Sequence, residues 1–499
     1  MRAAPLLHDL LFDAARLVPT KVAITSREAS ITYAELAREV EALAGCLASA
    51  GVDRGDRVVI LADNTIETVI AFWAALAANA APVILHPTTK PARLAYVLED
   101  SGARALVVDA GIAASVPATS RPHLVVEIGD TWWREALAGG AAAPRRRCID
   151  LDLAALIYTS GSTGQPKGVM LTHRNMLAAT ASVSGYLHIR EDEVILCVLP
   201  LAFGYGLYQV IMAIAAGARV VLERSFAFPA QTLQLVAEER VTGFPGVPTM
   251  FAAMLALKSI ATFDLSSVRF VTTAAAALPV KHVRELRSLL PTARIFSMYG
   301  LTECKRCTYL PPEDLERKPG SVGIAIPNTE LWIVDDEDRR LGPGEVGQLV
   351  VRGATVMRGY WNNAAETARK LRPGPVPGEH VLYTGDLCRL DEDGYLYFVA
   401  RMDDIIKSRG EKVPPKVVES AILDIVGVRE TAVVGVHDEV LGQAIKAFVV
   451  LEPGVTLDAS TIQRECRARL EGVMVPREIV IREALPRSAN GKIQKSELT

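Results

Sequence analysis

The chain has 499 residues, of which 50% are hydrophobic and 22% charged, a composition that globular domains reach and disordered chains do not. Lysine and arginine number 54 against 57 aspartates and glutamates, so the formal net charge of -3 provides no overall positive field for nucleic acid or anionic lipid. We therefore expect no nucleic-acid partner, and the length predicts more than one domain.

Cysteine usage and the first residues of the chain predict a cytoplasmic protein. The seven cysteines are an odd number without framework spacing, which suits a reducing compartment. His8, Asp9 and Asp13 interrupt the first apolar stretch, so we expect no secretion signal. The most apolar window, 69–85, contains Pro82 and is short for a bilayer, which favours a buried helix followed by a strand over a membrane span.

Short β-branched runs alternate with segments of helical length along much of the chain. The alternation is clear over residues 56–108, and it resumes after an Ala/Gly/Arg-rich connector near residues 139–147. Such alternation is typical of β/α units with parallel strands. We expect two stacked β/α layers.

The helical period vanishes over residues 320–401, where turn signals such as GPG and DG separate strand-like runs. This pattern predicts a small β-rich subdomain. Residues 403–499 mix helices and strands in a compact α+β length that could fold as a mobile lid. The predicted fold is thus α/β, with a large N-terminal domain over residues 1–402 and a small C-terminal domain over residues 403–499.

A loop of small hydroxylated residues contains the strongest chemical signal. Residues 158–168 read YTSGSTGQPKG and continue the strand-like run LAALIY. Glycine N–H groups, several hydroxyls and Lys167 together suit phosphate binding. The loop is not a Walker A motif, because Pro166 stands where the second glycine belongs. A flexible Ser/Gly turn is the structural alternative.

With five further blocks, this loop makes the sequence resemble the adenylate-forming superfamily, which includes acyl-CoA synthetases, adenylation domains of peptide synthetases and firefly-type luciferases. The loop region reads YTSGSTGQPKGVMLTHRN, and the blocks that follow in order are LPLAFGYGL, MYGLTE, YTGDL, ARMDDIIKSRGEKVPP and PRSANGKIQKSEL. The similarity extends from near Ile31 to Lys492. It implies an enzyme that uses ATP and Mg²⁺ to form an acyl-adenylate.

The resemblance also implies a nucleotide site. Its expected residues are Thr159, Ser160, Gly161, Ser162, Thr163, Gly164, Lys167, Ala275, Tyr299, Gly300, Thr302, Asp386, Arg401 and Lys412. Tyr299 would stack on adenine, Asp386 would accept the ribose hydroxyls, and Arg401 would add a donor nearby. Glu303 is the expected metal ligand, because a hard cation prefers carboxylate oxygen together with phosphate oxygen. Taken alone, core packing at a strand end is the lesser alternative for Tyr299, whereas a commonplace turn is the better interpretation of Asp386.

Four residues are expected to be catalytic: Thr163, Lys167, Glu303 and Lys492. By resemblance, Lys492 bridges the attacking carboxylate and the α-phosphate in the first half-reaction, where positioning and electrostatic stabilisation dominate. Asp403 matches the family's hinge, where backbone rotation changes the face of the lid that meets the active site. Lys407 and Gly410 are expected along the thiol channel. The alternative is that the segment around Lys407 and Gly410, and Lys492 as well, are simply solvated and charged.

The acyl pocket is expected to be lined by Phe203, Tyr205, Gly206, Gly246, Val247, Ala274, Ala276 and Met298. Many acyl-CoA synthetases carry histidine at the position of Phe203, so the gating role of that histidine does not transfer. Domains that activate α-amino acids carry aspartate where this chain has Gly204, and without it an α-ammonium would be buried unpaired. We therefore expect a fatty, branched or aryl carboxylic acid.

The segment Cys304-Lys305-Arg306-Cys307 has no role that the resemblance supplies. The cysteine pair lacks a second pair or a nearby histidine, so we expect no metal or redox function. Two alternatives stay open for Arg306: contact with a polar acyl group, or an internal salt bridge.

The expected thiol acceptor is CoA, since no carrier domain follows Lys492 in the sequence. A separate acyl or peptidyl carrier protein, through its phosphopantetheine, stays open as the alternative acceptor. Two further possibilities are a luciferase-like monooxygenase and a non-catalytic adenylate-binding relative. The non-catalytic relative predicts loss of charge at Lys492 or Glu303, and both residues are present.

Overall fold

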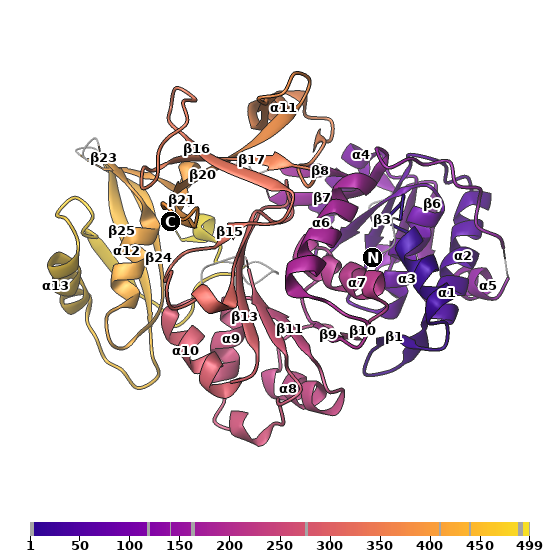
Figure 1. Cartoon of the computed structure of the whole chain (residues 1–499), viewed down its shortest axis with the longest axis horizontal. Helices are drawn as coiled ribbons and strands as arrows, with labels where there is room; N and C mark the ends of the chain where they lie inside the picture. The colour runs from indigo at the N-terminus through magenta and orange to yellow at the C-terminus, as the bar shows by residue number, and fades with distance from the viewer. Residues whose placement is uncertain are drawn as a thin grey trace. The chain divides into compact units, whose positions relative to one another are not determined.

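The computed structural model describes residues 4–116, 120–139, 141–160, 165–274, 278–408, 411–438, 441–487 and 493–498. Figure 1 shows the helices and strands along the chain. Contacts divide the chain into two units. The first consists of Met1–Leu331 and Val351–Leu382, and the second of Trp332–Val350 and Tyr383–Thr499. The prediction of an α/β fold with a large N-terminal and a small C-terminal part is confirmed. The domain boundary at Asp403 stays a prediction, because it concerns which part moves.

In the first unit, a four-stranded parallel sheet has the order β4-β3-β5-β6. Its strands are β3 (Arg57–Leu61), β4 (Ala81–Leu85), β5 (Ala105–Val108) and β6 (Leu124–Glu127). The helices of this region are α2 (Tyr33–Ser49), α3 (Ile66–Ala77), α4 (Pro91–Ser101) and α5 (Thr131–Ala138). These elements confirm the β/α alternation predicted over residues 56–108.

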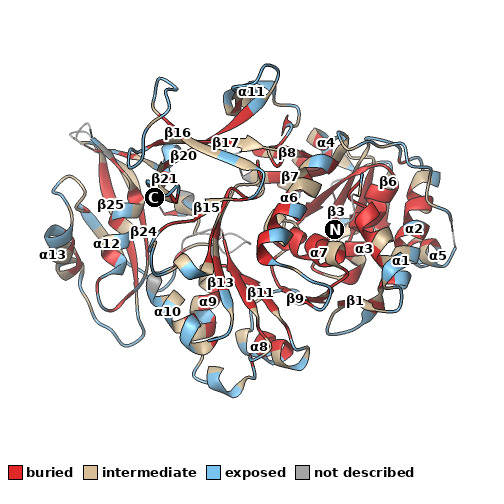
Figure 2. Ribbon diagram, viewed as in Figure 1, coloured by how far each residue is buried: buried red, intermediate tan, exposed pale blue. Residues whose placement is uncertain are grey.

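Helix α3 accounts for the most apolar window of the sequence. The Thr65 side chain accepts a hydrogen bond from the Thr68 N–H at its start, and Asn79 adopts a positive φ of 66° just after its end. All of its residues except Glu67 are buried, and Figure 2 shows the burial around this sheet. The prediction of a buried helix followed by a strand is confirmed. Within the described ranges, none of the helices combines the length and apolarity that a bilayer crossing requires.

A nine-stranded sheet of the same unit has the order β15-β14-β13-β12-β11-β9-β10-β1-β2. Its strands are β1 (Val22–Thr25), β2 (Ser30–Thr32), β9 (Val194–Cys197), β10 (Arg219–Leu222), β11 (Gly243–Gly246), β12 (Phe270–Thr273), β13 (Arg294–Tyr299), β14 (Thr308–Leu310) and β15 (Ile324–Ala325). The helices nearby in sequence are α1 (Asp9–Leu17), α6 (His173–Leu187), α7 (Gly204–Ala216), α8 (Pro229–Glu238), α9 (Pro248–Leu255) and α10 (Val280–Leu289). Strands β9 to β13 are parallel, which confirms the second β/α layer.

The hydroxyl-rich loop joins two antiparallel strands, β7 (Leu153–Ser160) and β8 (Pro166–Thr172), and the short β18 (Gly359–Tyr360) pairs with β8. The strand predicted at LAALIY is confirmed as part of β7. Helix α11 (Ala364–Lys370) and strand β19 (Leu371–Pro373) also belong to the first unit.

Residues 320–401 are mainly strands, as predicted, but they are divided between the two units. Strands β16 (Thr329–Val334), β17 (Gly347–Gly353) and β20 (His380–Leu390) each contain residues of both units. In the first unit β20 pairs with β19, and in the second it pairs with β21 (Leu396–Arg401).

The rest of the second unit contains a sheet of order β23-β22-β25-β24, with β26 parallel to β25. Its elements are β22 (Ile406–Ser408), β23 (Glu411–Val413), α12 (Pro415–Leu423), β24 (Val428–Asp438), β25 (Gly442–Leu451), α13 (Ala459–Arg469) and β26 (Glu478–Ile481). One face of the sheet is covered by a core that includes Val418, Ile422 and Ile462 from the two helices. The α+β composition predicted for this segment is confirmed.

Candidate active site

The carboxyl ends of neighbouring parallel strands bring several predicted site segments together. Gly246 at the end of β11 pairs with Thr273 at the end of β12, and Thr273 pairs with Ser297 of β13. Val247 and Ala274 directly follow the first two strands, and β13 ends at Tyr299. Ligands in open α/β sheets bind at this edge. The register therefore places the predicted acyl segments beside the block that carries Tyr299.

Glu303, the expected metal ligand, is held by Tyr360. The Tyr360 hydroxyl donates a 2.7 Å hydrogen bond to Glu303 Oε1, and the Met357 N–H donates to the Glu303 carbonyl oxygen at 2.7 Å. Burial and the nearby negative charge of Glu303 raise the pKa of Tyr360, so its hydroxyl stays protonated and donates. Oε1 is thus occupied while Oε2 accepts no hydrogen bond from the described residues, and a free carboxylate oxygen fits a hard cation shared with phosphate.

Lys167 belongs to the same network. Its Nζ donates a 2.8 Å hydrogen bond to Glu366 Oε1 and lies 5.8 Å from the centroid of the Tyr360 ring. Both partners of this ion pair are largely buried, with exposed side-chain fractions of 11% for Lys167 and 14% for Glu366. The Arg369 guanidinium, which bonds both carboxylate oxygens, and Lys167 lower the pKa of Glu366 to about 2. Glu366 therefore stays charged and fixes the position of Lys167.

Tyr360, Glu366 and Arg369 were not expected from the sequence. They lie in and just before helix α11, in the run GYWNNAAETARK, which contains no chemical motif. An Asn363 side chain that accepts from the Glu366 N–H starts the helix and sets the direction of Glu366. The only feature visible in the sequence was the start of this helix, and a helix start does not indicate that Glu366 pairs with Lys167.

Tyr205 and Met298, two of the residues expected to line the acyl pocket, are both hydrogen-bonded. The Tyr205 hydroxyl donates to the Thr272 carbonyl oxygen at 2.9 Å, at the end of β12. The Met298 sulfur accepts from the Tyr186 hydroxyl at 2.9 Å. Phe203 immediately precedes helix α7, with an extended backbone conformation.

Two glycines of this region differ in their surroundings. A Cβ at Gly206 would lie 2.4 Å from the carbonyl oxygens of Leu199 and Pro200, whereas one at Gly204 would meet only Ile157 Cδ1, at 3.8 Å. Gly206 is therefore required by a close approach of backbone to backbone. Gly300 is similar, since a Cβ there would lie 2.6 Å from the Lys305 carbonyl oxygen.

The segment after Glu303 packs against helix α7. Lys305 Nζ donates a 2.7 Å hydrogen bond to the Gly204 carbonyl oxygen and lies 4.1 Å from the centroid of the Tyr208 ring. Cys304 and Cys307 are buried, and their sulfurs lie 3.1 Å apart without forming a disulfide. Arg306 is buried, and in the part of the chain that the structure describes it forms no salt bridge. The alternative of an internal salt bridge for Arg306 is thus not supported.

In the second unit, Asp386 and Arg401 face each other on paired strands. They are register partners on β20 and β21, and Arg401 Nε donates to Asp386 Oδ1 at 3.2 Å. Asp386 is buried, and its N–H donates to the Thr384 hydroxyl at 3.1 Å, across the left-handed Gly385. The two residues expected near the ribose are therefore neighbours.

The remaining predicted residues of the second unit are exposed or undescribed. Asp403 is exposed in a short 3₁₀ turn, and the exposed Lys407 on β22 is the register partner of Lys412 on β23. Several predicted residues of the chain lie outside the described ranges: Gly161, Ser162, Thr163, Gly164, Ala275, Ala276, Gly410 and Lys492. The side chains of Ser160 and Lys412 are likewise not described. These assignments stay predictions.

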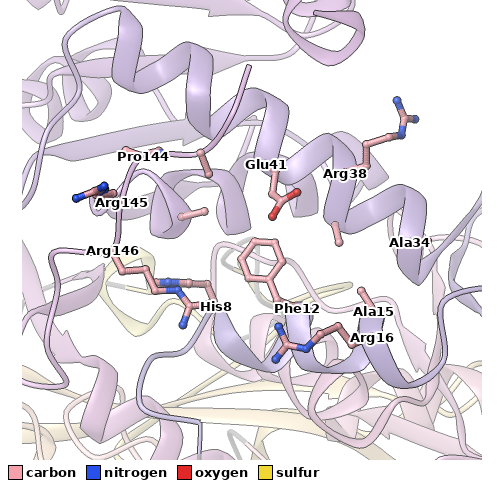
Figure 3. A pocket seen from close by; sticks show the side chains of 13 residues that line it. His8, Phe12, Ala15, Arg16, Ala34, Arg38, Glu41, Pro144, Arg145 and Arg146 are labelled. Atoms are coloured by element: carbon pink, nitrogen blue, oxygen red, sulfur yellow. The ribbon is translucent and has the colours of Figure 1, made fainter. Parts of the chain in front are cut away.

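A hollow away from all these residues lies between helices α1 and α2 and residues 143–146. It has a volume of about 550 Å³ (Figure 3). Its lining includes Phe12 and Glu41, which point toward each other, together with Arg146 and the buried His8. None of the predicted site residues lines it.

Comparison with known proteins gives the same family over most of the chain. Residues 11–361 match the family model described as AMP-binding enzyme, and residues 417–492 match the AMP-binding enzyme C-terminal domain. A long-chain-fatty-acid–CoA ligase of Bacillus subtilis (strain 168) is 31% identical over 532 residues, covering 99% of this chain and 94% of that protein. A feruloyl-CoA synthase of Amycolatopsis sp is 34% identical over 488 residues, covering 97% of this chain and 96% of that protein.

Solved structures agree. ATP-bound MatB from Rhodopseudomonas palustris has a TM-score of 0.90 at 29% identity and covers 99% of this chain and 97% of its own. The anthranilate CoA ligase AuaEII in complex with anthranoyl-AMP has a TM-score of 0.89 at 28% identity, covering 99% and 96%. The resemblance stated from the motifs is confirmed: the chain belongs to the AMP-binding enzyme family.

Proposed function

We propose that this enzyme activates a carboxylic acid with ATP to an acyl-adenylate and transfers the acyl group to the thiol of CoA. The observation that carries the proposal is the shared strand edge, where Glu303, held by Tyr360, lies in the block beside the expected acyl segments. The names of the relatives support the acceptor, since they are a long-chain-fatty-acid–CoA ligase, a feruloyl-CoA synthase and an anthranilate CoA ligase.

In the first step, a carboxylate oxygen of the acid attacks the α-phosphorus of ATP. A new P–O bond forms, the bond from the α-phosphorus to the bridging oxygen breaks, and pyrophosphate leaves with that electron pair. Glu303 would hold Mg²⁺ through its free oxygen, and the bound ion would supply positive charge against the phosphate oxygens. We assign two lysines to these phosphates as further positive charges: Lys167, which Glu366 holds in place, and Lys492.

In the second step, the CoA sulfur attacks the acyl carbon of the adenylate. A C–S bond forms, the C–O bond to AMP breaks, and AMP leaves with the electron pair while the thiol proton passes to solvent. We assign Asp386 and Arg401, which bond each other, to the ribose in both steps, and Lys407 and Gly410 to the thiol path. Rotation at Asp403 exchanges the residues that serve the two steps.

The acid is a fatty, branched or aryl carboxylate rather than an α-amino acid. Gly204 at the start of α7 offers no carboxylate to an α-ammonium, and its carbonyl oxygen is occupied by Lys305 Nζ. An α-ammonium at this position would therefore find neither a carboxylate nor a free carbonyl oxygen, and burying it without a partner is unfavourable. We place the reaction in the cytoplasm, where ATP and CoA occur together.

The test is carboxylate-dependent exchange of labelled pyrophosphate into ATP, with fatty, branched, aryl, hydroxy and amino acids and no thiol. Exchange with non-amino acids alone supports adenylation and the pocket argument, and exchange with an α-amino acid overturns that argument. Acyl-CoA formation on adding CoA then supports the ligase. An acyl-adenylate that CoA leaves untouched, but that a carrier protein's phosphopantetheine consumes, would overturn the CoA assignment.

A further inference from the structure

Arg306 is a buried arginine with no counter-charge among the described residues. Only 4% of its surface is exposed, and its Nε is fully buried with no hydrogen-bond partner in those same ranges. Its guanidinium carbon lies 5.2 Å from the centroid of the Tyr205 ring. No carboxylate among the described residues pairs with it.

This arrangement is unusual because arginine keeps its proton under all ordinary conditions, and a buried charge is costly unless it is paired and hydrogen-bonded. A cation–π contact with one tyrosine ring compensates only part of that cost. The neighbouring Lys305 differs, since its Nζ donates to the Gly204 carbonyl oxygen and stacks on Tyr208. Lys305 thus bonds a carbonyl oxygen, whereas Arg306 meets the neutral Tyr186 hydroxyl and the Tyr205 ring, neither of which carries a compensating charge.

The surroundings of Arg306 are the expected acyl-binding residues. Tyr205, beneath its guanidinium, is one of them, and its hydroxyl bonds Thr272 at the carboxyl end of β12. The positive charge of Arg306 also acts on Tyr186, whose hydroxyl donates to the sulfur of Met298. A group bound against Tyr205 and Met298 would therefore lie within reach of the Arg306 guanidinium.

We propose that Arg306 is a specificity-determining residue that pairs with a second carboxylate on the acyl portion of the acid substrate. This inference rests on the proposed acid activation. The first carboxylate must stay free to attack the α-phosphorus, so the preferred substrate carries another carboxylate at its distant end or on its ring. The planar guanidinium presents two parallel N–H donors that match a carboxylate.

Each charge compensates the burial of the other when such an acid is bound. An acid that lacks the second carboxylate leaves Arg306 unpaired, and sites built to pair a polar group discriminate strongly against analogues without it. The discrimination comes from one buried cation, and for that reason a single substitution should remove it.

The experiment measures pyrophosphate exchange by the full-length enzyme with matched acids: dicarboxylic acids against monocarboxylic acids of the same carbon number, and a carboxy-substituted benzoate against benzoate. For the best pair, the wild-type kcat/KM should favour the dicarboxylic acid by about 100-fold or more. Arg306→Met should lose this preference mainly through KM and leave the monocarboxylic acid within about threefold. Arg306→Lys should restore part of the preference, and Arg287→Met, at an exposed arginine paired with Glu316, should keep all of it.

A wild-type enzyme that prefers the monocarboxylic member of every pair would overturn the inference while leaving the proposed function intact. A preference for the dicarboxylic acid that Arg306→Met retains would also overturn it. The wild-type ratio decides even if the variant does not fold. Absence of exchange with every acid would overturn the proposed function itself, and the inference with it.

Discussion

The hydroxyl of Tyr360 donates a 2.7 Å hydrogen bond to Glu303 across 57 residues of sequence. It occupies one oxygen of the carboxylate, and the other accepts no hydrogen bond from the described residues. The bond is between a neutral donor and a charged acceptor, the stronger class of hydrogen bond. Tyr360 is thus a positioning residue for the expected metal ligand.

Tyr360→Phe should therefore raise the Mg²⁺ concentration that gives half-maximal pyrophosphate exchange. One hydrogen bond to a charged group contributes about 1.5 to 3 kcal/mol, which corresponds to roughly a tenfold or larger shift. The measurement is a Mg²⁺ titration at saturating ATP and acid. Tyr397→Phe, which removes a hydroxyl bonded to Asp391 at 3.3 Å, is the matched control and should leave the titration unchanged. An unaltered Mg²⁺ requirement in Tyr360→Phe would contradict the assignment.

Substitution by alanine should change the stability of the enzyme differently at Gly206 and at Gly204. Gly206→Ala forces a methyl group to 2.4 Å from two backbone carbonyl oxygens, so we expect it to destabilise the enzyme by at least about 2 kcal/mol. Gly204→Ala adds the same methyl group to the same helix at an ordinary contact distance of 3.8 Å from Ile157 Cδ1, and helix propensity predicts a change between zero and about 1 kcal/mol in favour of folding. Thermal unfolding midpoints of the two variants decide the point. Equal midpoints would show that the backbone near Pro200 gives way.

Sequence patterns predicted the parts of this site that follow from order along the chain. The family motifs named Tyr299 and Ala274 as site residues, and in the structure Tyr299 ends β13 while Ala274 follows β12. The partner of Lys167 could not be found in this way, because Glu366 is 199 residues distant and periodicity does not encode which remote segments meet. Gly206 was expected only as a residue of the acyl pocket, whereas the atoms that require a glycine there are the carbonyl oxygens of Leu199 and Pro200.

Two buried histidines should make the free energy of unfolding depend on pH in the acidic range. The rings of His8 and His173 are 5.8 Å apart between centroids. Burial, reinforced by His173 and Arg146, lowers the pKa of His8 to about 3, and burial lowers that of His173 to about 4. The unfolded chain keeps both pKa values near about 6.5, so it binds more protons than the folded enzyme between pH 6.5 and pH 4. The free energy of unfolding must then fall as the pH falls through this window, by about 2 kcal/mol for each histidine from pH 6.5 to pH 5.

The measurement compares unfolding midpoints at pH 7 and pH 5. The wild-type enzyme should lose more stability on acidification than His8→Leu, which keeps the burial and removes one titrating group. His123→Leu, at an exposed histidine of the same unit, should match the wild type. Identical pH dependence in the wild type and His8→Leu would show that His8 does not couple protonation to folding.

Lys492→Ala separates the two half-reactions. Positive charge at the α-phosphate matters while the pentavalent phosphorus gains negative charge, and this happens only in adenylate formation. We expect pyrophosphate exchange to fall by at least about 100-fold, while thioester formation from supplied acyl-adenylate and CoA stays within about threefold of the wild type. Lys495→Ala serves as a control because Lys495, three positions along, already pairs with Glu419 at 2.7 Å. Equal losses in both half-reactions of Lys492→Ala would mean that the lysine supports binding common to both steps, and the charge would then have to come from Lys167, whose position Glu366 holds.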